Sequence, residues 1–249
     1  MELSIRSKVF TLPLFYNDTL IENSAGITTG YFSSIDKAAT EFLSSQEQIY
    51  FKSFKQDTPR LHYLLGRHSA KRALIECDAR ESDFTKISID TGVWGQPLLT
   101  SSPYLDVSIT HANRHGIGLI YAKQYPMGID IVGIDLHDID VLKTMTSIKE
   151  LTDIPSSELE GLTIAWSLKE ALSKALRCGL TVPLHILQMQ NFKFTDDIFE
   201  CEFCNFPQYK GIAWILGRNT IGIVYPVQLS TNTLMLNNTI NSLKYHFST

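Results

Sequence analysis

The spacing of apolar positions along the chain predicts three helices. Residues 36–56 are amphipathic in a way typical of one helix, which Asp57-Thr58-Pro59 ends. Pro59 suits the first turn of a second helix, whose apolar positions repeat at helical spacing to about residue 76. The clearest helix is predicted over 157–178, where Ser157 and Glu160 have the spacing of a capping box and Gly179 supplies a stop.

Short runs rich in Ile and Val predict strands between and after these helices. They lie at 86–91, 106–112, 116–122 and 127–134, and after the third helix at 192–197, 199–206, 210–217 and 219–229. The predicted order is therefore helices followed by strands in the first part of the chain, and a helix followed by strands in the second. We therefore predict an α+β fold with two similar halves, residues 1–125 and 126–249.

The composition narrows the class of protein. The chain has 249 residues, enough for one large domain or two small ones. Lys and Arg number 22 against 26 Asp and Glu, and a net charge of −4 argues against a protein whose whole surface follows nucleic acid. We recognise no signal peptide and no run of about 18 apolar residues, and we expect a cytoplasmic protein with no membrane association.

The four cysteines are expected to be reduced thiols, as is usual in a cytoplasm. Cys201 and Cys204 form a single CxxC, whereas a closed zinc site needs four ligands. The residues around this pair alternate between apolar and polar, which predicts a strand with structural cysteines.

Two of the predicted strands contain residues that could carry chemistry. Thr110 and His111 place a hydroxyl beside an imidazole, and both can donate hydrogen bonds to a phosphate. Asp130 lies in an otherwise apolar strand, where a carboxylate must be paired or bind a cation. A capping or core histidine and an Asp–Arg pair are the structural alternatives.

A third stretch lies on the predicted helix over 157–178. Glu170 and Lys174 are one turn apart and share a face, with Trp166 one turn before Glu170. Taken alone, this pair could be a solvated ion pair that contributes only ~0.3–0.5 kcal/mol.

Together, and in this order, these stretches resemble the 4'-phosphopantetheinyl transferases, in particular the single-chain, surfactin-type branch. The counterparts of the family's motifs are Gly95-Gln96-Pro97, Thr110-His111, Gly128 to Val132, and Trp166 to Lys174. A helix segment from Leu65 to Leu74 resembles the family's GR-containing helix. The resemblance covers about residues 55–185.

The resemblance implies Mg²⁺-dependent transfer of the 4'-phosphopantetheine group from coenzyme A to a serine of an apo acyl or peptidyl carrier protein, with release of 3',5'-adenosine bisphosphate. It also implies a monomer whose halves are related by a pseudo-twofold axis, with the active site in the cleft between them. Asp130 and Glu170 would be the metal ligands, and Glu170, Lys174 and His111 the catalytic residues. Residues implied to bind coenzyme A are Arg67, Arg60, Gly95, Gln96, Pro97, Thr110, His111 and Lys174.

Three positions depart from the family's pattern. Gln96 replaces a common Lys and Thr110 replaces Ser, while Val132 stands where this branch usually has a second metal carboxylate. We expect water to complete the metal's ligands, with Asp135 as the alternative. A non-catalytic coenzyme A- or nucleotide-binding module with a degenerate metal site remains a second hypothesis, and an α+β protein with only surface ion pairs a third.

Overall fold

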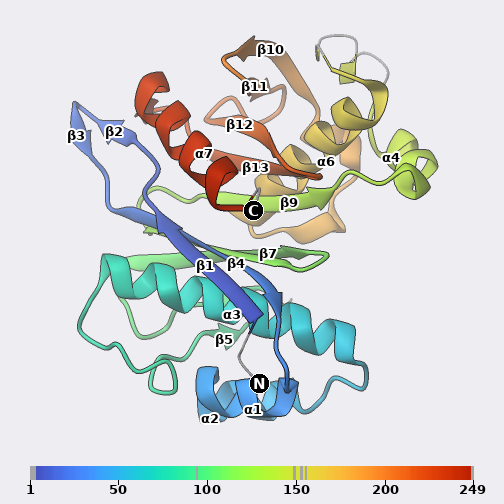
Figure 1. The fold of residues 1–249 in the computed structure, drawn as a ribbon. Helices are drawn as coiled ribbons and strands as arrows, with labels where there is room; N and C mark the ends of the chain where they lie inside the picture. The colour runs from blue at the N-terminus through green and yellow to red at the C-terminus, as the bar shows by residue number, and fades with distance from the viewer. Residues whose placement is uncertain (1–3, 94, 148–149, 152–153, 155, 248–249) are drawn as a thin grey trace. The chain divides into compact units, whose positions relative to one another are not determined.

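The computed structural model describes residues 4–93, 95–147, 150–151, 154 and 156–247. The chain forms two compact units. The first comprises Met1–Leu12 and Glu22–Gln124, and the second comprises Pro13–Ile21 and Tyr125–Thr249. Each unit has its own sheet and its own long helix (Figure 1).

The first unit is a four-stranded antiparallel sheet covered by one long helix. The strand order is β1 (Ser4–Phe10), β4 (Asn23–Tyr31), β8 (His115–Ala122) and β7 (Leu105–Ala112). Helix α3 (Asp57–Cys77) packs against β4, β7 and β8. The short helices α1 (Ile35–Phe42) and α2 (Ser45–Phe51) precede α3, and the two-residue strands β5 (Asp90–Thr91) and β6 (Pro97–Leu98) form a small hairpin after it.

The second unit is a five-stranded antiparallel sheet. Its order is β10 (Met189–Thr195), β11 (Ile198–Phe203), β12 (Tyr209–Leu216), β13 (Asn219–Pro226) and β9 (Gly128–Gly133). Helix α6 (Glu158–Ala175) packs against β9, β12 and β13, and the C-terminal helix α7 (Thr233–Phe247) packs against β12.

Smaller elements complete the second unit. After β9 come η1 (Leu136–Asp138) and α4 (Ile139–Met145), and after α6 come η2 (Gly179–Thr181) and η3 (Leu184–Leu187). Strands β2 (Leu14–Tyr16), β3 (Thr19–Leu20) and β14 (Ser230–Thr231) form a separate three-stranded sheet. The pairing of β14 with β2 is what places residues 13–21 in this unit.

The two units share one arrangement of strand, helix and hairpin. In the first, β4 leads to α3 and then to the β7–β8 hairpin, and β4 pairs with β8. In the second, β9 leads to α6 and, after β10 and β11, to the β12–β13 hairpin, and β9 pairs with β13. The predicted α+β class is confirmed, and each unit has a small antiparallel sheet and a long helix.

Glycines bring each helix close to its sheet at matching points. A Cβ atom on Gly26 of β4 would lie 2.2 Å from the Ser69 carbonyl oxygen of α3. One on Gly128 of β9 would lie 1.9 Å from the Ala171 carbonyl oxygen of α6. Only glycine permits backbones to approach this closely.

The predicted helix over 157–178 is confirmed as α6, and its capping box of Ser157 and Glu160 is present. The single helix predicted over 36–56 is wrong, because the chain forms α1 and α2 there. Ser44 breaks the helix by capping α2, and its hydroxyl and backbone amide bond reciprocally with Glu47. The strand predicted over 86–91 is reduced to Asp90–Thr91, and β1, β4 and α7 were not predicted.

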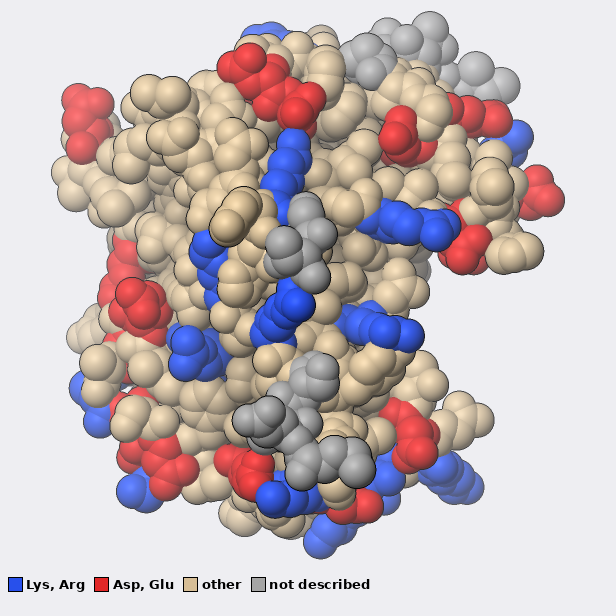
Figure 2. Space-filling view, viewed as in Figure 1, with Lys and Arg blue, Asp and Glu red and all other residues tan. Residues whose placement is uncertain are grey.

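Charged side chains of both signs are spread among uncharged ones on the face drawn in Figure 2, in keeping with a modest net charge of −4. None of the helices in the described ranges is both long and apolar enough to cross a membrane.

Candidate functional site

Asp130, Glu170 and Lys174 gather between β9 and α6 in the second unit. Asp130 shares a face of β9 with Gly128, which faces α6, because side chains two apart on a strand point the same way. The Lys174 ammonium donates to Asp130 Oδ1 at 2.6 Å and to the Ile129 carbonyl at 3.2 Å. Asp130 is 6% exposed, so its charge meets this partner largely away from water.

Glu170 belongs to the same electrostatic group. Burial raises the pKa of Glu170, the charge of Asp130 raises it further, and the charge of Lys174 lowers it. Two carboxylates and one ammonium have a formal charge of −1 when all three groups are ionised. Such a group favours a cation, and carboxylates are the ligands that Mg²⁺ prefers.

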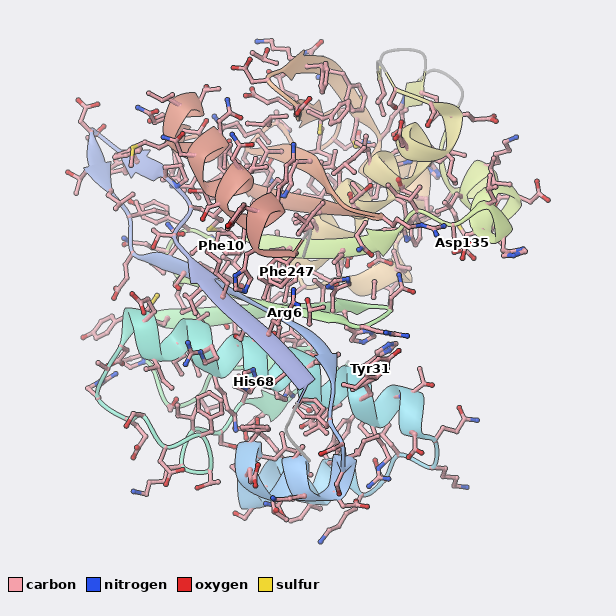
Figure 3. The ribbon with its side chains drawn as sticks, in the orientation of Figure 1. Arg6, Phe10, Tyr31, His68, Asp135 and Phe247 are labelled. Carbon is pink, nitrogen blue, oxygen red and sulfur yellow. The ribbon has the colours of Figure 1, made fainter. Side chains whose placement is uncertain are left out.

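Val132 and Asp135 differ in what they offer to that group. Val132 follows Asp130 on the same face of β9 but carries no ligand atom. Asp135 lies past the end of β9, beside α4 (Figure 3), and its carboxylate accepts from the His137 amide at 3.0 Å as the cap of η1. Within the described ranges, no three His, Cys, Asp or Glu side chains are grouped so that they could hold a metal ion.

Lys169, beside Glu170 in the sequence, has a different environment. It is buried, and its ammonium donates to Glu150 Oε2 and to the Met145 carbonyl, each at 3.0 Å. Glu150 Oε1 also accepts from the Met189 amide at 3.0 Å. Successive helix residues point about 100° apart, so the adjacent Lys and Glu serve separate tasks.

The first unit contains a cavity of about 340 Å³. Four of the residues predicted to bind coenzyme A line it: Arg67, Gly95, Pro97 and His111. The remaining lining is mostly aromatic or apolar: Tyr50, Phe54, Pro59, His62, Tyr63, Gly66, Thr91 and Ile109. A largely apolar cavity with a few polar groups is typical of a site for a small organic ligand.

Three rings form one wall of this cavity. The centroids of Tyr50, Phe54 and Tyr63 are 5.3–5.5 Å apart in every pair. These three residues were not predicted as site residues, since aromatic residues at helical spacing usually belong to a core. They come from α2, from α3 and from the segment between them, and the break at Ser44 that forms α2 was not predicted.

Arg67 is held at the edge of that wall. Its guanidinium lies 4.7 Å above the Tyr63 ring, and Nη2 donates to Thr91 Oγ1 at 3.3 Å. Nε lies 3.4 Å from Glu47 Oε1, and within the described residues this nitrogen makes no hydrogen bond. Arg67 is only 5% exposed, so a positive charge is buried beside the cavity.

His111 is stacked on a second histidine. The rings of His111 and His62 are 4.4 Å apart and inclined by 23°, and His62 Nε2 lies 3.0 Å from the Asn113 carbonyl oxygen. His62 was not predicted as a site residue. Thr110 is buried on the opposite face of β7 from His111, since neighbouring strand residues alternate, and it does not line the cavity.

The other two predicted residues lie near the cavity without lining it. Arg60 forms ion pairs with Asp36 and Asp57, and its guanidinium lies 4.7 Å above the Phe51 ring. The Gln96 side chain covers Gly92, where a Cβ atom would lie 2.4 Å from its amide carbon.

Residues 126–222 match a family model described as the 4'-phosphopantetheinyl transferase superfamily. This range contains Asp130, Glu170 and Lys174. No curated protein matches the chain in sequence. Among solved structures, the chain is similar to a holo-(acyl-carrier-protein) synthase from Bacillus anthracis strain Ames in complex with coenzyme A (3',5'-ADP). The identity is 21%, with 47% of this chain and 93% of that chain covered and a TM-score of 0.33.

Proposed function

We propose that this chain is a member of the 4'-phosphopantetheinyl transferase superfamily and transfers the phosphopantetheine arm of coenzyme A to a serine of an apo carrier protein. The observation that carries the proposal is the group of Asp130, Glu170 and Lys174. Two carboxylates and an ammonium meet between β9 and α6, inside the range that matches the family.

The donor set of this group suits Mg²⁺. Asp130 and Glu170 would hold the ion, and water would supply the other ligands, because Mg²⁺ usually retains several waters. The bound ion would neutralise charge on the pyrophosphate. Its binding would also offset the repulsion between the two carboxylates that raises the pKa of Glu170.

In the proposed step Glu170 is the general base. It accepts the proton of the carrier serine, whose oxygen forms a bond to the β-phosphorus of coenzyme A. The bond from that phosphorus to the bridging oxygen breaks, and 3',5'-adenosine bisphosphate leaves with the electron pair. Lys174 and His111 donate to phosphate oxygens as negative charge develops on them.

The cavity of the first unit is proposed to hold the nucleotide end of coenzyme A. The rings of Tyr50, Phe54 and Tyr63 offer an apolar surface to a planar base, and Gly95 and Pro97 also line the cavity. Arg67 offers a buried guanidinium to a phosphate, a pairing that forms strong, charge-assisted hydrogen bonds. Arg60, Gln96 and Thr110 remain predicted contacts.

Mass spectrometry tests the proposal directly. The protein is incubated with coenzyme A, Mg²⁺ and a panel of apo carrier proteins from fatty acid, polyketide and peptide synthesis. We expect at least one carrier to gain the mass of phosphopantetheine, and the gain to need both Mg²⁺ and Glu170. Coenzyme A binding with no mass gain on any carrier would favour the non-catalytic binding module.

A further inference from the structure

The matching glycine contacts put α3 and α6 in a common register. Gly26 meets Ser69 as Gly128 meets Ala171, and Gly116 of β8 meets the backbone of Leu65 as Gly222 of β13 meets that of Ser167. Counting from these contacts, Arg67 occupies the position of Lys169, and Lys71 occupies that of Ser173. The two helices can therefore be compared side chain by side chain.

Each unit contains a buried glutamate that a basic residue of the long helix neutralises. In the second unit Glu150 is paired with Lys169, at 3.0 Å. In the first unit the corresponding acid is Glu47, whose carboxylate accepts from the Ser44 amide at 2.8 Å and from the Ile89 amide at 3.3 Å. Glu47 is 2% exposed and so needs a cation.

The closer cation of Glu47 is Lys71 and not Arg67, the residue equivalent to Lys169. Lys71, one turn further along α3, donates to Glu47 Oε2 at 2.5 Å and to the carbonyls of Phe42 and Phe84, each at 2.8 Å. Arg67, at the position of Lys169, is 3.4 Å from Glu47 without a hydrogen bond from its Nε. The hydrogen-bonded pair with Glu47 is therefore made one turn further along the helix, by Lys71, while Arg67 keeps a longer ion pair with the same carboxylate.

The two groups of charges differ in their sum. The charges of Lys169 and Glu150 sum to zero, whereas those of the cluster of Glu47, Lys71 and Arg67 sum to plus one. Arg67 is the member of this cluster that lines the cavity. Arg67 directly precedes His68, whose place on α3 is marked in Figure 3. A buried excess charge is costly unless a counter-ion meets it, so the cluster is suited to an anion in the cavity.

We propose that Lys71 is a positioning residue, which neutralises Glu47 and so leaves the Arg67 guanidinium available to a phosphate group of coenzyme A. This inference rests on the proposed function, which supplies the ligand. Without Lys71, the Nε–H of Arg67 would close the 3.4 Å gap to Glu47, and the charge offered to the cavity would fall from plus one to zero.

The test measures coenzyme A binding by calorimetry for three proteins: wild type, K71M and the double variant E47Q/K71M. A charge-assisted hydrogen bond lost to the ligand corresponds to about tenfold or more in Kd, which is the weakening expected for K71M. In the double variant Glu47 is neutral and Arg67 is released, so its Kd should return to near the wild-type value. Gln keeps the cap of α2, because a capping box accepts Glu or Gln.

A matched control removes the equivalent pair in the second unit. The variant E150Q/K169M should lose thermal stability much as E47Q/K71M does, with no change in the Kd of coenzyme A. Wild-type affinity in K71M, or equal weakening in K71M and the double variant, would overturn the inference. If K71M does not fold, weakened coenzyme A binding by a folded E47Q/K71M variant would by itself overturn the inference. A wild-type protein that binds no coenzyme A would instead overturn the proposed function, and this inference with it.

Discussion

Replacing Gly128 by Ala should separate β9 from α6 and thereby disrupt the group formed by Asp130, Glu170 and Lys174. The new Cβ atom would lie 1.9 Å from the Ala171 carbonyl oxygen and 2.8 Å from the Ala175 amide nitrogen. Both are backbone atoms, so no side-chain rotation relieves the overlap. An ordinary contact starts near 3.4 Å, so the strand and helix must part by about 1.5 Å.

The size of this displacement sets the expected effect. Overpacking of this kind costs about 1–3 kcal/mol of stability. A shift of ~1 Å in a positioned catalytic group can cost ~100-fold in rate, so we expect kcat/KM to fall by about that factor in the folded protein. Turnover is measured by the mass gain of a responsive carrier, and the folded fraction by circular dichroism.

Gly211 provides a control on the same sheet and helix. A Cβ atom there would meet Leu168 Cδ2 at 2.7 Å and Cys201 Sγ at 3.1 Å, and both are side-chain atoms that can shift. G211A should therefore keep turnover close to that of the wild type. A folded G128A variant with unchanged kcat/KM would refute the idea that the contact of β9 with α6 sets the site.

Two further predictions concern carboxylates of the second unit. E170Q should lose turnover yet melt at a higher temperature than the wild type at neutral pH. A raised pKa means that the folded state binds the proton of Glu170 more tightly than the unfolded chain does, so ionisation of Glu170 lowers the free energy of unfolding as the pH rises. The difference in melting temperature should therefore vanish at acidic pH, where Glu170 is protonated in both states. A lower melting temperature for E170Q at neutral pH would contradict the assigned cause of the pKa shift. D135A should keep full Mg²⁺-dependent turnover, because Asp135 lies past the end of β9 and caps η1. Loss of metal-dependent turnover in a folded D135A variant would instead make Asp135 a third carboxylate ligand of the metal.

Local patterns made α6 predictable. The capping box of Ser157 and Glu160 involves residues three apart, and the apolar stripe repeats with the helical period, so the sequence contains both signals. The one-turn spacing of Glu170 and Lys174 likewise follows from the helix alone. The order of the motifs, from Thr110-His111 to Lys174, was enough to suggest the superfamily.

Other features depend on partners distant in the sequence. The break between α1 and α2 depends on Ser44 and on Glu47, whose carboxylate is satisfied by Lys71 and by the Ile89 amide. The aromatic wall needs α2 packed beside α3, and the His62–His111 stack needs α3 against the end of β7. Periodicity reports which face of an element is apolar, but it does not report which element covers that face.

The sequence by itself therefore determined the α+β class and the main helix, because these follow from hydrogen bonds and periods within single elements. Tertiary structure decided which cation neutralises which acid. Lys169 and Lys71 look alike as helical lysines, and Arg67 looks like any basic residue of an amphipathic helix. Close glycine contacts set the register of each helix on its sheet. That register lets Lys71 form the closer ion pair with Glu47 and places Arg67 in the lining of the cavity.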